Sequence, residues 1–170
     1  MMHSVVLARR PQGNPVEADF AVREAPLPEV GNGFFLTRNT FISLDAGFRN
    51  WMNEDSGDEV LPAMELDEPV MGLVLAEVLE SRHPDYQVGN KLMARFAWQT
   101  HSLSDGSDFI ARLPAQLEFN PSAYMGVLGD TGMSCRLYTS DAADEWLRVV
   151  RGGGRCLKTG RGGGGGGGGG

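Results

Sequence analysis

The stretch that decides the fold is FFLTRNTFISL, which runs from Phe34 to Leu44. It is rich in aromatic and β-branched residues, which favour a half-buried strand of a β-sheet. Successive side chains of a strand point to opposite faces. One face of this strand is therefore expected to carry Phe35, Thr37, Asn39, Phe41 and Ser43.

Similar patterns lie on both sides of this stretch, separated by turns rich in Pro, Gly, Asn and Asp. The further segments that we expect to be strands are Asp19–Ala25, Val70–Leu79, Lys91–Phe96, Trp98–Ser102 and Asp108–Leu113. A helix competes for the apolar segment Val70–Leu79, but Pro69 and Gly72 disfavour it. Many short strands with regular turn signals are typical of a small β-barrel or sandwich.

Three other segments are expected to lie outside the strands. Asp45–Asn53 should leave the sheet as a turn or short helix, and the acidic segment Glu54–Glu68 should be a mobile loop. A helix should begin at Asn120, which can cap free amides, with Pro121 at the first helical position. Its apolar residues face several sides, so we expect this helix to need a partner surface.

The charge of the chain excludes some functions. Residues 1–134 contain nine Arg or Lys and nineteen Asp or Glu, a net charge of −10, against −7 for all 170 residues. A strongly acidic domain repels phosphate backbones, so we expect no nucleic-acid partner, although a small anion could still bind at a local basic spot. No apolar run approaches the ~18 residues of a membrane helix. We therefore expect a cytoplasmic protein with no membrane partner.

The composition changes after Ser134. Both cysteines, Cys135 and Cys156, fall beyond it, and the chain ends in a glycine run, Gly162–Gly170. Glycine runs bury no apolar surface, so we expect a disordered tail. The segment LYTSDAADE, which starts at Leu137, resembles a translated sequencing adapter. We therefore divide the chain into domain 1–134 and a non-native or disordered tail 135–170; a genuine Gly-rich interaction tail is the alternative.

Four stretches carry a resemblance to a known family. They begin with LARRPQGNPVEADFAVREAPLPEVGNGFFLTRNTFISLD at Leu7, continue with AGFRNWMN and EVLESRHPDYQVGNKLMARFAWQTHSL, and close with LPAQLEFNPSAYMGVLGDTGMS. Their order resembles the N-terminal domain of zinc-independent medium-chain dehydrogenases/reductases. The nearest branch contains prostaglandin, leukotriene and curcumin-type alkenal/one reductases.

The resemblance implies a mainly β fold, a GroES-like, partly open β-barrel with a C-terminal helix. In this family a Rossmann domain follows and binds NADPH, whose hydride passes to an α,β-unsaturated carbonyl substrate, and the full-length parent is expected to be a homodimer. The glycines of Gly152–Gly154 lack the dinucleotide-binding spacing. We therefore expect this chain to bind no cofactor tightly and to be inactive alone. A stand-alone GroES-like binding module and a quinone reductase relative remain alternatives.

The resemblance also implies candidate site residues. Those expected along the substrate cleft are Asp45, Phe48, Arg49, Trp51, Met52 and Gln99, and those expected at the cofactor edge are Thr131 and Gly132. Four of these residues have a plainer alternative: Asp45 could be an ordinary turn aspartate, Arg49 could pair with a local carboxylate, Trp51 could pack on the barrel, and Gln99 could be a surface residue of a strand edge. No catalytic residue is assigned.

No metal site is expected. The three histidines, His3, His83 and His101, lack zinc-ligand spacing and have no partner cysteine in residues 1–134. The chain also departs from the family pattern at several positions. Gly47 stands where Tyr or Ala is frequent, so a proton relay through a hydroxyl there is in doubt.

Overall fold

A computed structural model describes residues 1–57 and 61–140. The chain divides into two compact units, Met1–Met125 and Gly126–Gly170. Each unit is described by itself. The first contains all of the strands found in the described residues, so the expectation of a mainly β fold is confirmed.

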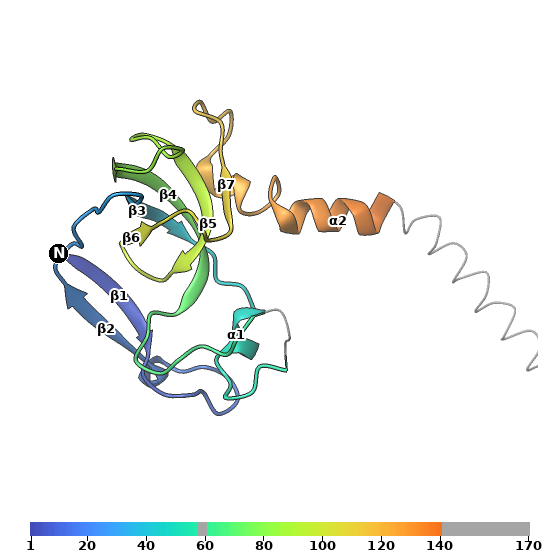
Figure 1. The fold of residues 1–170 in the computed structure, drawn as a ribbon. Coiled ribbons are helices and arrows are strands. Elements are labelled where there is room, and N and C mark those ends of the chain that lie inside the picture. Colours follow the sequence, from blue (N-terminus) through green and yellow to red (C-terminus); the bar gives the residue numbers. More distant parts are fainter. Residues whose placement is uncertain (58–60, 141–170) are drawn as a thin grey trace, which may run out of the picture. The chain divides into compact units, whose positions relative to one another are not determined.

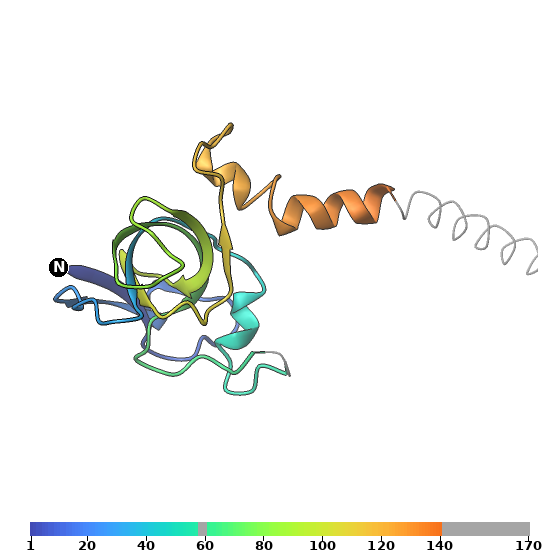
Figure 2. The same ribbon diagram turned by 45° about the horizontal axis from the view of Figure 1, so that its top comes forward.

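The larger sheet has five antiparallel strands in the order β6-β3-β4-β5-β7. Their bounds are β3 Phe35–Ile42, β4 Met71–Ser81, β5 Lys91–Ala97, β6 His101–Ser104 and β7 Ile110–Arg112. Figure 1 shows these strands beside one another, and Figure 2 shows the sheet curling round on itself. Strands β6 and β7 end the strand order and are not paired with each other in the described residues, so the barrel is open between them.

A two-stranded sheet joins β1 (Met2–Leu7) to β2 (Phe20–Ala25). The segment after β5 bonds to β1: the Val5 amide donates to the Trp98 carbonyl at 2.8 Å, and the Thr100 amide donates to the His3 carbonyl at 2.9 Å. The expectation of one strand over Trp98–Ser102 is therefore only partly right. Its first half bridges to β1, and β6 begins only at His101, because the chain changes partner between the two sheets.

Strand β3 departs from simple alternation. Phe35, Leu36 and Thr37 are all buried, whereas Phe41 is exposed although it was expected on the face of Phe35. The cause is irregular pairing with β4, since the register shifts between Leu36 and Thr37 and again between Asn39 and Phe41. The first shift leaves Leu79 of β4 without a partner residue, and the second leaves Thr40 of β3 without one. The extra residue in β3 changes the face that Phe41 occupies.

Two apolar clusters hold the first unit together. The first lies on the curled sheet and consists of Phe35, Val74, Ala76, Val78, Leu92, Ala94 and Phe96. The second joins the smaller sheet to the segment after β3 and consists of Leu7, Phe48, Met52, Met64 and Val70. Residues 54–57 and 61–68 contain no helix or strand, as expected, but Met64 is buried in the second cluster.

Gly72 shows why the segment Val70–Leu79 forms a strand with a glycine near its start. A Cβ built on Gly72 would lie 2.6 Å from Trp98 Nε1 and 2.7 Å from Trp98 Cδ1. The indole therefore lies directly on the glycine backbone, and it also stacks on Phe20 with ring centroids 5.9 Å apart. Only glycine leaves room for this contact.

The expected helix from Asn120 is interrupted. Residues Pro121–Tyr124 form a 3₁₀ helix, and the Asn120 side chain accepts a hydrogen bond from the Ser122 amide at 3.1 Å, as its capping residues predict. That short helix closes the first unit. The next helix, α2, runs over Asp130–Ser140 in the second unit. The expectation of one helix was wrong because glycines at 126 and 129 separate the two segments.

Within the second unit, Gly132 fits against its own loop. A Cβ built on it would overlap the Val127 carbonyl, and the Gly132 amide donates to the Gly126 carbonyl at 3.1 Å. Val127, Leu128 and Met133 are exposed within this unit, and the need for a partner surface stays a prediction. Helix α2 continues past Ser134 to Ser140, and the expected glycine tail lies outside the described residues.

Candidate functional site

The predicted cleft residues near position 50 lie on a short helix, α1 (Phe48–Trp51), as the turn-or-helix prediction required. Asp45 precedes it and is exposed. Its carbonyl accepts the Phe48 amide at 3.2 Å, and its Oδ2 accepts the Ser43 hydroxyl at 2.8 Å. Asp45 therefore orders the chain that enters α1.

The apolar residues of this segment face the protein interior. Phe48 and Met52 are buried in the second cluster. Trp51 is partly buried against the same cluster, and its ring meets Phe48 edge to face with centroids 5.2 Å apart. The contacts of these three side chains are core contacts, and their role in a substrate cleft remains a prediction.

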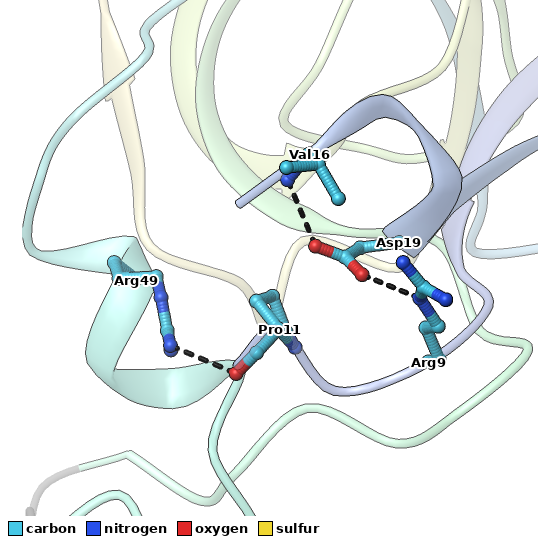
Figure 3. Close-up of polar contacts among 5 residues, drawn as sticks. All are labelled: Arg9, Pro11, Val16, Asp19 and Arg49. Atoms are coloured by element: carbon cyan, nitrogen blue, oxygen red, sulfur yellow. Dashed lines mark hydrogen bonds and ion pairs between the residues drawn. The ribbon is translucent and has the colours of Figure 1, made fainter. Parts of the chain in front are cut away.

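Arg49 points from α1 to the loop that follows β1. Its Nη2 donates to the Pro11 carbonyl at 3.0 Å and to the Gly13 carbonyl at 2.8 Å, while its Nε donates to Gly13 at 3.0 Å. Its Nη1 donates to Asn53 Oδ1 at 2.6 Å. Figure 3 shows the contact with Pro11. These bonds go to carbonyl and amide oxygens rather than to a carboxylate, and they anchor the segment to the loop.

Arg10 makes the reciprocal contact. Its Nη1 donates to the carbonyls of Met52, Asn53 and Met64 at 3.0, 2.9 and 3.1 Å. Arg10 and Arg49 thus each hold the backbone on which the other's contacts depend, and we call this pair the arginine clasp. The sequence did not predict these contacts, because nothing in the spacing of Arg10 and Arg49 indicates which distant carbonyls an arginine reaches.

Asp19 closes the same loop from the other end. Its side chain is 2% exposed; Oδ1 accepts from Arg9 Nε at 2.6 Å, and Oδ2 accepts from the Val16 amide at 2.8 Å (Figure 3). The Val16 amide, and then the Arg9 guanidinium, hold the pKa of Asp19 below its ordinary value. The strand pattern around Asp19 gave no sign of this role.

Gln99 lies elsewhere, in a groove of about 450 Å³ between β1 and the exposed end of β3. The residues lining it are His3, Ser4, Val5, Val22, Asn39, Thr40, Phe41, Ile42, Trp98, Gln99 and Thr100. Gln99 Nε2 donates to Ser102 Oγ at 3.0 Å, and Asn39 Nδ2 donates to the Gln99 carbonyl at 2.9 Å. Amides and hydroxyls beside apolar walls can bind and orient a molecule with a polar head.

Trp98 connects the groove to α1. It lines the groove and also packs against the cluster that holds Phe48 and Met52. Its Nε1 is buried and has no hydrogen-bond partner in the described residues. The side chains of Trp98 and Val5 therefore join the groove of Gln99 to the α1 residues, since both line the groove and pack against the second cluster. Thr131 and Gly132 lie in α2, in the other unit.

Two further findings concern the described residues only. In 1–57 and 61–140, no group of three or more His, Cys, Asp or Glu side chains is placed to hold a metal ion. No helix among them has the length and apolar character needed to cross a membrane.

Comparison with known proteins agrees with this architecture. Residues 3–111 match the family described as the N-terminal domain of oxidoreductase, and the chain belongs to that family. The structure is similar to the crystal structure of CurA from Vibrio vulnificus, with a TM-score of 0.72 and 30% identity, over 83% of this chain and 40% of CurA. The similarity to CurA in complex with NADPH is nearly the same, with a TM-score of 0.71.

Two curated relatives carry the same likeness. The chain is 34% identical to the NADPH-dependent curcumin reductase of Escherichia coli (strain K12) over 76% of this chain and 36% of that protein. It is 30% identical to prostaglandin reductase 1 of Oryctolagus cuniculus over 72% of this chain and 33% of that protein. The expected relation to prostaglandin and curcumin reductases is thus confirmed, and the chain spans about a third of the length of these relatives.

Proposed function

We propose that residues 1–134 are the substrate-side domain of an NADPH-dependent, zinc-independent reductase of α,β-unsaturated carbonyl compounds. Two matches carry this proposal. The sequence matches the family of oxidoreductase N-terminal domains, and the fold matches the structure of CurA in complex with NADPH. In this proposal residues 135–170 form no part of the domain.

The arrangement of the site supports a binding role for this domain. In the groove, the Gln99 side-chain amide uses one N–H for Ser102 and keeps the other, beside the apolar side chains of Phe41 and Ile42, which suits a carbonyl compound with an apolar body. The arginine clasp holds α1 beside the core on which Trp98 rests. In such an enzyme the cofactor supplies the hydride, and the protein supplies orientation.

We further propose that the 170-residue chain by itself does not reduce an enone and does not bind NADPH tightly. The reason is that residues 1–159 contain no G-x-G-x-x-G segment, the glycine pattern that binds dinucleotides, and a run of glycines alone has no side chains to pack a nucleotide-binding helix. The purified chain should leave NADPH absorbance unchanged when a straight-chain enone is added. Saturable NADPH binding or enone-dependent oxidation by this chain would contradict this part of the proposal.

A domain exchange tests the substrate-side role itself. In the chimera, residues 1–125 replace the matching part of the Escherichia coli NADPH-dependent curcumin reductase. We expect the chimera to oxidise NADPH in the presence of an enone, and Gln99→Ala to raise its KM for the enone. NADPH binding, measured by nicotinamide fluorescence, shows whether the part retained from the Escherichia coli enzyme is folded. A chimera that folds and binds NADPH but reduces no enone would refute the role.

A further inference from the structure

A separate pocket lies in the loop between β1 and β2, next to the arginine clasp. It has a volume of about 230 Å³, and we call it the loop pocket. Its lining consists of Arg9, Arg10, Gln12, Asn14, Val16 and Asp19. None of these residues lines the Gln99 groove, and none belongs to the cleft that the sequence predicts.

The charge of the loop pocket contrasts with the domain around it. Two arginines and one aspartate line it, whereas residues 1–134 as a whole carry a net charge of −10. Both carboxylate oxygens of Asp19 already accept hydrogen bonds from the protein, one from Arg9 and the other from the Val16 amide. Its buried carboxylate therefore orients the arginine and has no oxygen left without a hydrogen bond.

Arg9 keeps donors available for a ligand. Its bond to Asp19 uses only Nε, its side chain is 60% exposed, and no acceptor among the described residues contacts its two terminal nitrogens. Gln12 and Asn14 are exposed, and the side-chain amide of neither has a partner in the described residues. Guanidinium and amide donors thus line the pocket together.

The backbone of the pocket is held in place without a ligand. The arginine clasp fixes the carbonyls of Pro11 and Gly13 from one side. From the other side, the amides of Ala8 and Arg9 donate to the Asp19 carbonyl at 2.9 and 3.2 Å. Such preorganisation lowers the entropic cost of binding, because little of the loop has to be ordered by the ligand.

We propose that the loop pocket binds a tetrahedral oxyanion of the phosphate class, either inorganic phosphate or a small phosphate monoester. Arginine forks form charge-assisted hydrogen bonds with such oxygens. A tetrahedral dianion can use donors from several directions at once, whereas a planar carboxylate is matched by a single guanidinium. The overall negative charge of the domain disfavours long polyanions, so the ligand should be small.

Calorimetric titration of the full 170-residue chain tests the proposal at one fixed ionic strength. The probes are inorganic phosphate, glycerol phosphate and acetate. We expect saturable binding of at least one phosphate, and the stronger of the two identifies free phosphate or a monoester as the source. Absence of saturable binding for both phosphates, or equal binding of acetate, would overturn the proposal.

Two variants locate the binding. Asn14→Asp breaks no side-chain hydrogen bond found in the described residues and adds a negative charge to the pocket, so phosphate affinity should fall roughly tenfold. Arg23→Gln is the matched control, because Arg23 pairs with Asp67 on the surface at 3.1 Å and lies outside the pocket; its affinity should be unchanged. An unchanged affinity in Asn14→Asp, or an equal loss in both variants, would place the anion elsewhere.

Discussion

Replacing Gly72 by alanine tests the contact between β4 and Trp98. Alanine normally improves a strand, because glycine costs about 0.5–1 kcal/mol more in backbone entropy. Here the new Cβ would lie 2.6 Å from Trp98 Nε1, well inside the ~3.5–4.0 Å of an ordinary contact. Either the indole or the strand must therefore move by about 1 Å, and the stack of Trp98 on Phe20 must change with it.

The two effects have opposite signs, and the contact should dominate. Forcing an extra methyl group into a packed site costs about 1–3 kcal/mol. After the gain from alanine is subtracted, we expect Gly72→Ala to lower the free energy of unfolding by about 0.5–2 kcal/mol. In urea, with a slope of about 2 kcal/mol/M, this corresponds to a midpoint lower by roughly 0.3–1 M with an unchanged slope.

Urea unfolding, followed by far-UV circular dichroism, measures the change. Gly47→Ala is the control, since nothing lies within 4 Å of its added Cβ and its φ of −57° suits alanine. That variant should be stabilised by about 0.4–1 kcal/mol. In a Trp98→Phe background, which lacks the pyrrole atoms, the cost of Gly72→Ala should fall by at least half. A Gly72→Ala protein as stable as the parent would refute the reasoning.

Three other substitutions test the clasp, the loop and the core. Asp19→Asn should destabilise the fold at neutral pH. The pKa of Asp19 is lowered in the folded state, so its carboxylate stabilises the fold above the unfolded pKa of about 3.9, and this stabilisation is lost as pH falls below that value. The difference in urea midpoint between variant and parent should therefore shrink at low pH, and urea unfolding at several pH values measures it. Arg49→Gln removes the charge-assisted bonds to the carbonyls of Pro11 and Gly13, of which Pro11 is buried, and should cost about 1.5–3 kcal/mol, against about 0–1 kcal/mol for Arg23→Gln; equal urea midpoints would contradict the clasp. Leu92→Ala empties a site with no exposure and should cost about 2–5 kcal/mol by thermal unfolding, and a loss below about 1 kcal/mol would show that the first cluster is not the core.

Much of the fold can be predicted from local patterns. The strand signals near Asp19, Phe34, Val70 and Lys91 each correspond to an observed strand, because alternation and β-branched residues act over a few neighbouring positions. The helix signal at Asn120 was correct for its cap and wrong for its length. Capping is decided within one turn, whereas the length of a helix depends on the residues beyond that turn.

The candidate site was predictable only in part. The residues of α1 were identified as a group through the family resemblance, and the structure places them on one short helix. Arg10, which donates to the carbonyls of Met52 and Asn53 just after α1, was missed. The same holds for Asp19, whose burial depends on Arg9 and on the Val16 amide rather than on any pattern in its own strand.

The sequence by itself determined the class of fold, the acidic charge of the domain and the family to which it belongs. Only the tertiary structure decided that Phe41 leaves the face of Phe35 and that residues 98–100 bond to β1. It also decided that Arg10 and Arg49 each donate to backbone carbonyls next to the other arginine. The physical reason is distance along the chain. The alternation of apolar and polar residues acts over a few neighbouring positions. By contrast, segments dozens of residues away decide where a bulge forms, which strand a segment pairs with and which carbonyl an arginine reaches.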